Sequence, residues 1–163
     1  MDKSFLLRVN NSLKKIKTQL LLNDSIRQKL YYETIDETTP VPVIDQVKDH
    51  VYLQPVITVE TMEPFNKQNY ITITIPEGDK HNNKMEYVVR VIVMSEKKSW
   101  NLNGDVRPLL ISQEIINILD GYKLDFSNTL EFTNIVETVT SKDVYGYSIL
   151  FGVVDGISDV DEK

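Results

Sequence analysis

The chain has 163 residues, a length that favours a single domain with a core large enough to fold without covalent cross-links. It contains no cysteine, which excludes disulfides and thiolate metal sites, and its two histidines, His50 and His81, lie far apart in polar surroundings, so we expect no metal centre. The net charge of −6 argues against general attraction to nucleic acid, and without a membrane-length apolar run or a signal-peptide pattern we expect a soluble protein made in a reducing cytoplasm.

Residues 1–32 are predicted to form two helices, at 3–22 and 26–32, separated by a break with several capping residues at Asn23-Asp24-Ser25. The first helix is amphipathic, because its apolar residues recur at helical spacing: Leu6, Val9, Leu13, Ile16 and Leu20. Its cations lie away from that stripe. This helix is therefore expected either to pack on its own sheet with a solvated basic face, or to dock on a neighbouring subunit.

Residues 33–55 lose this periodicity and are predicted to form an extended arm or surface loop. Pro40 and Pro42 favour extended backbone there, and residues 44–51 have room for one short helical turn. A connection of this length inside a domain is usually functional or mobile.

Residues 56–154 are predicted to hold the β-sheet core. Short strands are expected at 56–62 and at 70–75, the second ending at Pro76 before a polar hairpin loop at 77–84. The next strand, 85–94, is apolar on both faces apart from Arg90, which indicates a central strand covered on one side by helix and on the other by a further layer or subunit.

A polar, mobile-looking stretch at 95–105 contains Trp100, which is expected to be either a lid on the core or an interface anchor. A helix is predicted at about 106–120, with Asp105 as its cap and Pro108 in its first turn. Strands at 130–140 and 144–154 should then form a hairpin. One face of the last strand carries Gly146 and Gly152, which would let another segment approach the backbone closely. The acidic tail, 155–163, is expected to be disordered.

These patterns predict an α+β fold for a single domain, 1–163. The N-terminal amphipathic helix and the helix at 106–120 would pack with a mixed or mostly antiparallel sheet of about four to five strands, the second helix lying on one face of it.

Motifs that carry chemistry are missing from the sequence. The six glycines form no phosphate-binding loop, and no hydrolase or metalloprotease signature occurs. Basic residues do not alternate with aromatic residues as they do in nucleic-acid-binding proteins. The sequence therefore predicts a protein that is not an enzyme, binds no cofactor and does not recognise nucleic acid.

The order of elements and three short segments resemble the tail-terminator and neck (head–tail joining) proteins of long-tailed bacteriophages. The segments are Lys29-Leu30, RPLLISQEI at 107–115, and Val144-Tyr145-Gly146-Tyr147. The resemblance implies a structural virion protein that forms a ring, usually a hexamer, at the head–tail junction. Its partners would be the tail tube protein and the head–tail connector protein, and genomic DNA would pass through the ring without being read.

Seven residues are expected at subunit interfaces under this interpretation: Arg90, Trp100, Arg107, Pro40, Pro42, Tyr145 and Tyr147. A further hypothesis is that the basic first helix attracts the acidic tail of a neighbouring subunit. Two alternatives stay open: another neck ring, such as a connector-completion or stopper protein, and a cellular ligand-binding or regulatory α+β module with a concave pocket.

Overall fold

The computed structural model describes residues 3–53, 68–81, 84–125 and 128–155. The helical elements in these ranges are α1 (Lys3–Leu22), α2 (Asp24–Tyr31), α3 (Ile44–Val47), η1 (Lys48–His50), η3 (Lys97–Ser99) and α4 (Arg107–Leu119). The strands are β1 (Val51–Leu53), β2 (Asn69–His81), β3 (Lys84–Glu96), β4 (Asn101–Leu102), β5 (Asp105–Val106), β6 (Asn128–Ser141) and β7 (Val144–Asp155).

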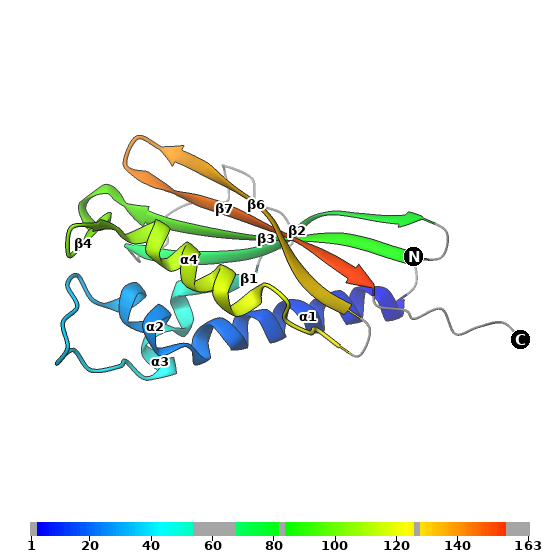
Figure 1. Cartoon of the computed structure of the whole chain (residues 1–163), viewed down its shortest axis with the longest axis horizontal. Coiled ribbons are helices and arrows are strands. Elements are labelled where there is room, and N and C mark those ends of the chain that lie inside the picture. Colours follow the sequence, from blue (N-terminus) through cyan, green and yellow to red (C-terminus); the bar gives the residue numbers. More distant parts are fainter. Residues whose placement is uncertain (1–2, 54–67, 82–83, 126–127, 156–163) are drawn as a thin grey trace, which may run out of the picture.

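Five strands form the main sheet, in the order β1-β2-β3-β7-β6. β1 pairs with β2 in parallel and every other pair is antiparallel, so the sheet is mixed. The helices α1, α2 and α4 lie together on one side of this sheet (Figure 1). The predicted α+β fold is confirmed, including the helix on one face of a five-stranded sheet.

The core fills the space between the helices and the sheet. α1 contributes Val9, Leu13, Ile16 and Leu20 of its predicted stripe, and α4 contributes residues at helical spacing that meet every second residue of β3. The fully buried members include Ile16, Leu20, Ile111, Ile115, Leu119, Val89, Val91 and Val93. Because burial of each such side chain stabilises the fold by about 1.5–3 kcal/mol, this layer holds α1 and α4 in fixed positions on the sheet.

The opposite face of β3 is more sheltered than its sequence suggested. Ile92 and Met94 are buried there within the single chain, beside Tyr70, whereas Val88 and Arg90 are half-buried. Of the two coverings that the sequence left open for this face, a further layer or a subunit, a subunit is not needed to keep Ile92 and Met94 from water.

β2 continues past the proline that was expected to end it. The register between β2 and β3 shifts between Thr74 and Glu77, and Pro76 lies in this irregularity. β1 pairs only with Ile71, Thr72 and Ile73, so Pro76 also lies beyond the part of β2 that β1 covers. A proline is tolerated at such a position because its missing N–H removes no hydrogen bond from the ladder.

Two predicted segments cannot be compared with the structure. The strand at 56–62 and the tail from 156 onward lie outside the described residues, and Asp155 is the last residue of β7. The short helical turn expected within 44–51 is confirmed as α3 and η1.

Candidate interaction surface

The stretch at 95–105 is built of short regular elements. η3 follows β3 directly, and β4 and β5 then form a tight hairpin whose turn residues, Asn103 and Gly104, have positive φ angles of 53° and 95°. An Asn-Gly pair is a strong sequence signal for such a turn, because both residues tolerate left-handed backbone. The predicted cap of α4 was wrong: Asp105 lies in β5, and the N-cap position is held by Val106, which makes no side-chain cap.

Arg107 lies at the start of α4 and is fully buried. Its guanidinium donates to four backbone carbonyl oxygens, those of Ser99, Lys29, Tyr32 and Glu33, over 2.5–2.7 Å. Three of these carbonyls come from the C-terminal end of α2 and the residues after it. A helix leaves its last carbonyls without intrahelical partners, and a cation there also meets the negative end of the helix dipole. Arg107 thus satisfies the end of α2 and joins it to α4.

Burial lowers the pKa of Arg107 from its ordinary value, and nearby Glu33 opposes that shift. An arginine titrates so far above neutrality that the guanidinium stays charged in the fold. Because its donors are occupied by the chain itself, this side chain is not available to a neighbouring copy. Its role in the single chain is to fix the first residues of the arm.

The predicted arm, 33–55, is only partly correct, because residues 51–53 pair with β2 as β1. The arm as the structure has it, residues 33–49, is held against its own chain rather than extended away from it. Gln28 donates to the Thr39 carbonyl oxygen over 2.8 Å, and the side chain of Asn103 donates to the Ile35 carbonyl oxygen. Hydrogen bonds from the Thr38 hydroxyl and amide and from the Thr39 hydroxyl hold the pKa of Asp36 below its ordinary value.

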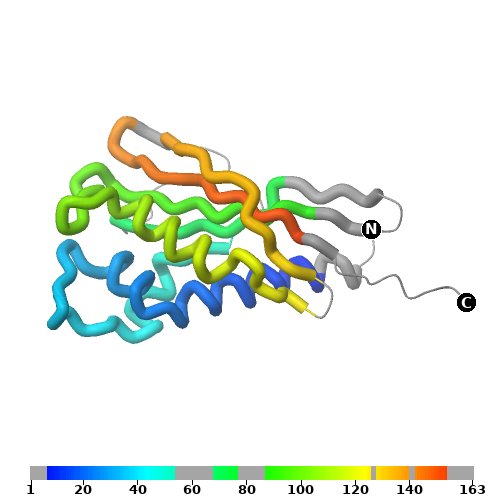
Figure 2. The backbone as a smooth tube through the Cα atoms, viewed as in Figure 1, coloured from blue at the N-terminus to red at the C-terminus, as the bar shows by residue number. Residues whose placement is uncertain are grey.

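The arm presents apolar side chains to solvent even though its backbone is fastened. Val41 is 40% exposed, Val43 63% and Ile44 38%, whereas Pro42 between them is buried. The chain segment that carries them lies at the same end of the molecule as the β4–β5 hairpin (Figure 2). Ordered backbone combined with exposed valines is typical of a surface prepared for a partner, because little conformational entropy remains to be lost on binding.

Trp100 and Tyr145 are stacked on one another, with ring centroids 5.1 Å apart and planes 21° from parallel. Trp100 lies just before the β4–β5 hairpin, Tyr145 is near the start of β7, and both are half-buried. The Tyr145 hydroxyl donates to the Lys142 carbonyl oxygen, which orients its ring. The pair therefore ties the tip of the β6–β7 hairpin to η3.

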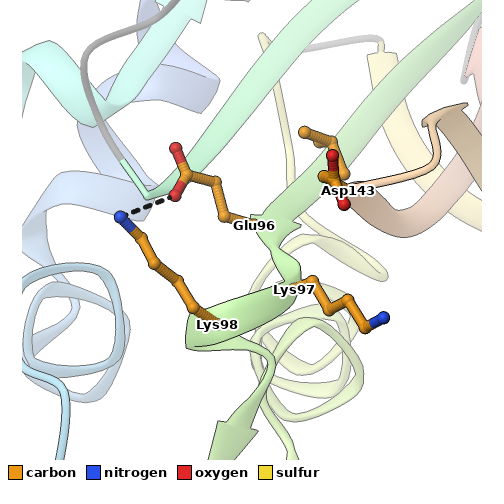
Figure 3. A pocket seen from close by; sticks show the side chains of 5 residues that line it. Glu96, Lys97, Lys98 and Asp143 are labelled. Atoms are coloured by element: carbon orange, nitrogen blue, oxygen red, sulfur yellow. Dashed lines mark ion pairs between the residues drawn. The ribbon is translucent and has the colours of Figure 1, made fainter.

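A cavity of about 470 Å³ lies beside this contact, lined by Glu96, Lys97, Lys98, Asp143 and Val144. Figure 3 shows Lys98 turned towards Glu96, with which it forms an ion pair of 3.1 Å, while Lys97 points the other way. Asp143 faces the cavity from the β6–β7 turn. Two lysines and two carboxylates balance in charge, so the lining does not select a ligand by net charge.

A second cavity, of about 260 Å³, lies between the end of α2 and the start of β2. Its polar lining includes Tyr31, Tyr32, Glu33, His50 and Asn69. His50 is buried and its Nδ1 lies 2.7 Å from the Asn69 carbonyl oxygen, so Nδ1 carries a proton and donates it to that carbonyl. The Asn69 side chain in turn accepts from the Ser99 hydroxyl over 2.9 Å.

The seven residues expected at interfaces are distributed over three places. Trp100 and Tyr145 meet, with half-buried Tyr147 two residues along the same strand; Pro40 and Pro42 are in the arm; and half-buried Arg90 lies on the sheet face away from the helices. Arg107 joins two of these places from inside. Sequence reasoning missed the exposed valines of the arm, although Pro40 and Pro42, which flank Val41, pointed to that segment.

Within the described ranges, no group of three or more metal-ligating side chains comes together. None of the helices in those ranges combines the length and apolarity that crossing a bilayer requires.

Comparison with known proteins identifies the family. A family model described as YomW matches residues 23–153, from the residue that caps α2 to near the end of β7. The chain belongs to the YomW family. YomW is a name of the kind given to phage genes, and the chain is accordingly phage-related. The match includes the arm, the β4–β5 hairpin and the main sheet except the last two residues of β7, but leaves all of α1 outside the YomW model. No curated protein and no solved structure matches the chain.

Proposed function

We propose that this YomW-family chain is a structural virion protein that forms a ring at the head–tail junction of a tailed phage. The ring, a hexamer in the resemblance, would cap the tail tube and join it to the neck connector. Its partners would be further copies of the chain, the tail tube protein and the head–tail connector protein. Genomic DNA would pass through the centre without sequence recognition, and the chain would perform no catalysis.

One observation carries this proposal beyond the family match. The arm holds Val41, Val43 and Ile44 exposed on backbone that Arg107, Gln28 and Asn103 fasten in place. Exposure of these apolar side chains to water is unfavourable in an isolated molecule, and a partner that covers them removes this cost. An assembly protein made in the host cytoplasm and incorporated into the virion would have this property.

The ring is tested by the mass of the purified chain in solution. Mass photometry and light scattering across concentration should reveal a closed oligomer, and negative-stain images should show a ring with a central opening. A chain that stays single at the highest concentrations, and also fails to enter assembled particles in the producing host, would refute the proposal.

A sibling ring of the neck, such as a connector-completion or stopper protein, is the nearest alternative. The two roles differ in their neighbours, because a terminator binds the tail tube whereas a connector-completion protein binds the portal. Copurification from the producing host with a tagged chain distinguishes them: tube protein supports the terminator, and portal protein supports the alternative.

The cavity beside His50 favours a second candidate function, a ligand-binding or regulatory module. Tyrosine, carboxylate and imidazole groups converge there in a space of about 260 Å³, which suits a small polar molecule. A ligand bound only by the folded state raises the melting temperature. A thermal-shift screen of small polar metabolites with reproducible hits, on a chain that remains monomeric, would favour this function over the ring.

A further inference from the structure

We propose that the outer face of α1 is the docking site for the arm of a second copy of this chain. The inference rests on the proposed ring and assigns its subunit contact. α1 buries one side against the sheet, and its other side is a continuous exposed stripe at helical spacing: Leu7, Asn11, Lys14, Thr18 and Leu22. Leu7 is 60% exposed and Leu22 54% exposed, and the stripe between them is about 22 Å long.

The charge of α1 has a single sign. Its 20 residues include five cations (Lys3, Arg8, Lys14, Lys15 and Lys17) and no carboxylate. Arg8 and Lys14 are exposed on or beside the stripe, and exposed Lys15 donates from its ammonium group to the Leu124 carbonyl oxygen. A partner for this face should therefore combine apolar side chains with negative charge.

The arm has that combination. Five exposed carboxylates surround its exposed valines, namely Glu33, Asp36, Glu37, Asp45 and Asp49, while its one cation, Lys48, is paired with Asp45 over 3.1 Å. The threonine hydrogen bonds that lower the pKa of Asp36 keep that carboxylate charged in mildly acidic solution. Two complementary surfaces on one chain identify a second copy as the partner.

The two surfaces lie in different places on the molecule. The arm is at one end, beside the β4–β5 hairpin, whereas α1 runs along the length of the helical layer (Figure 1). The exposed stripe is on the side of α1 opposite its buried residues. A contact that joins different surfaces of identical chains is heterologous: each copy uses its arm on one neighbour and its α1 on another. Repetition of that contact closes a ring when the rotation between copies allows it.

Single substitutions on the two surfaces, in the full chain, test the contact. Lys14→Glu reverses a charge on the α1 stripe, and Glu37→Lys and Val43→Ser alter the arm without touching a hydrogen bond of the fold. Each should weaken assembly at least tenfold in the concentration at which it half-dissociates. Lys142→Glu and Val139→Ser make the same kinds of change at exposed positions of the β6–β7 hairpin and should leave assembly unchanged. Melting temperatures close to wild type confirm that the variants fold.

Mixing gives the sharpest result. The Lys14→Glu chain keeps an intact arm and the Val43→Ser chain keeps an intact α1, and neither change compensates for the other, so an equimolar mixture should form one-to-one dimers that cannot grow into rings. Ring formation by all the variants, as in wild type, would overturn this contact and leave the proposed ring standing. A wild-type chain that remains a monomer would overturn both the proposed ring and this contact. Variants that dissociate when alone and form no mixed dimer would overturn the heterologous pairing of the arm with α1.

Discussion

Removal of the Arg107 side chain should have a large effect, because its guanidinium is the shared partner of four carbonyl oxygens, one in a buried hydrogen bond and three in part-buried ones. Leaving one buried polar group without a partner costs about 1–3 kcal/mol, so four such groups set an upper bound of roughly 4–12 kcal/mol. Water entering the vacated space, and the second lone pair of each carbonyl, reduce this cost. For Arg107→Ala we expect about 3–5 kcal/mol, because the variant leaves no unpaired charge but removes the shared donor of all four carbonyl oxygens.

Urea unfolding followed by circular dichroism measures this loss, and for a chain of this size the melting temperature should fall by roughly 6–20 °C. Arg107→Lys should lose less, because an ammonium group keeps the charge but cannot reach three separate segments with its donors. The effect should also be local: protease should cut the arm of the alanine variant before the chain unfolds. Arg8→Ala, at an exposed arginine, is the control and should change stability by less than about 0.5 kcal/mol. A loss below about 1 kcal/mol for Arg107→Ala would refute the reasoning.

Three further predictions concern Gly146, Tyr70 and Glu114. A Cβ at Gly146 would lie 1.7 Å from the Val93 carbonyl oxygen, whereas one at Gly152 would meet nothing within 4 Å. In urea unfolding, Gly146→Ala should therefore lower the free energy of unfolding by about 3 kcal/mol or more, and Gly152→Ala by less than about 1 kcal/mol. Equal losses for the two variants would contradict the close approach at Gly146. Burial, with a smaller effect of Glu96, raises the pKa of Tyr70 to about 12, so above pH 10 the unfolded chain loses a proton that the folded chain retains. The Tyr70 hydroxyl should thus leave the free energy of unfolding unchanged below pH 10 and lower it by up to about 1.4 kcal/mol per pH unit between pH 10 and 12. Tyr70→Phe should make this decrease less steep. An unchanged slope in the variant would contradict the role of Tyr70. Glu114 accepts a hydrogen bond from the Ser25 hydroxyl over 3.0 Å and forms an ion pair with Lys29. Glu114→Ala should therefore lower the stability measured by thermal melting by about 0.5–1.5 kcal/mol. No change would show that this link between α2 and α4 does not stabilise the fold.

The glycine-bearing face of β7 illustrates how far a pattern can be carried. The alternation along 144–154 indicated that some segment approaches the backbone there. The structure identifies it at Gly146 as the neighbouring strand β3, through the Val93 carbonyl oxygen. The approach therefore belongs to the packing of the sheet itself, and sequence alone had no means of choosing between an internal neighbour and an external one.

Local interactions allowed much of the fold to be predicted from sequence. The helical spacing of Leu13, Ile16 and Leu20 predicted α1, proline in the first turn located the start of α4, and alternation located β3, β6 and β7. Each of these signals depends on residues within a few positions of one another, which is why it can be read along the chain. The end of β2 was misjudged because a bulge, which needs the partner strand, absorbs Pro76.

Tertiary structure decided the rest. Arg107 resembles a helix-start cation in the sequence, yet it reaches carbonyl oxygens 74 to 78 positions away, and only packing of α2 beside α4 brings them within reach. The same contacts turn the arm, which the sequence showed only as an aperiodic stretch with prolines, into an ordered surface with exposed valines. The sequence by itself located α1, α4 and the long strands β3, β6 and β7, because those choices depend on near neighbours. Which side chains were left for a partner depended on long-range burial, which no local pattern encodes.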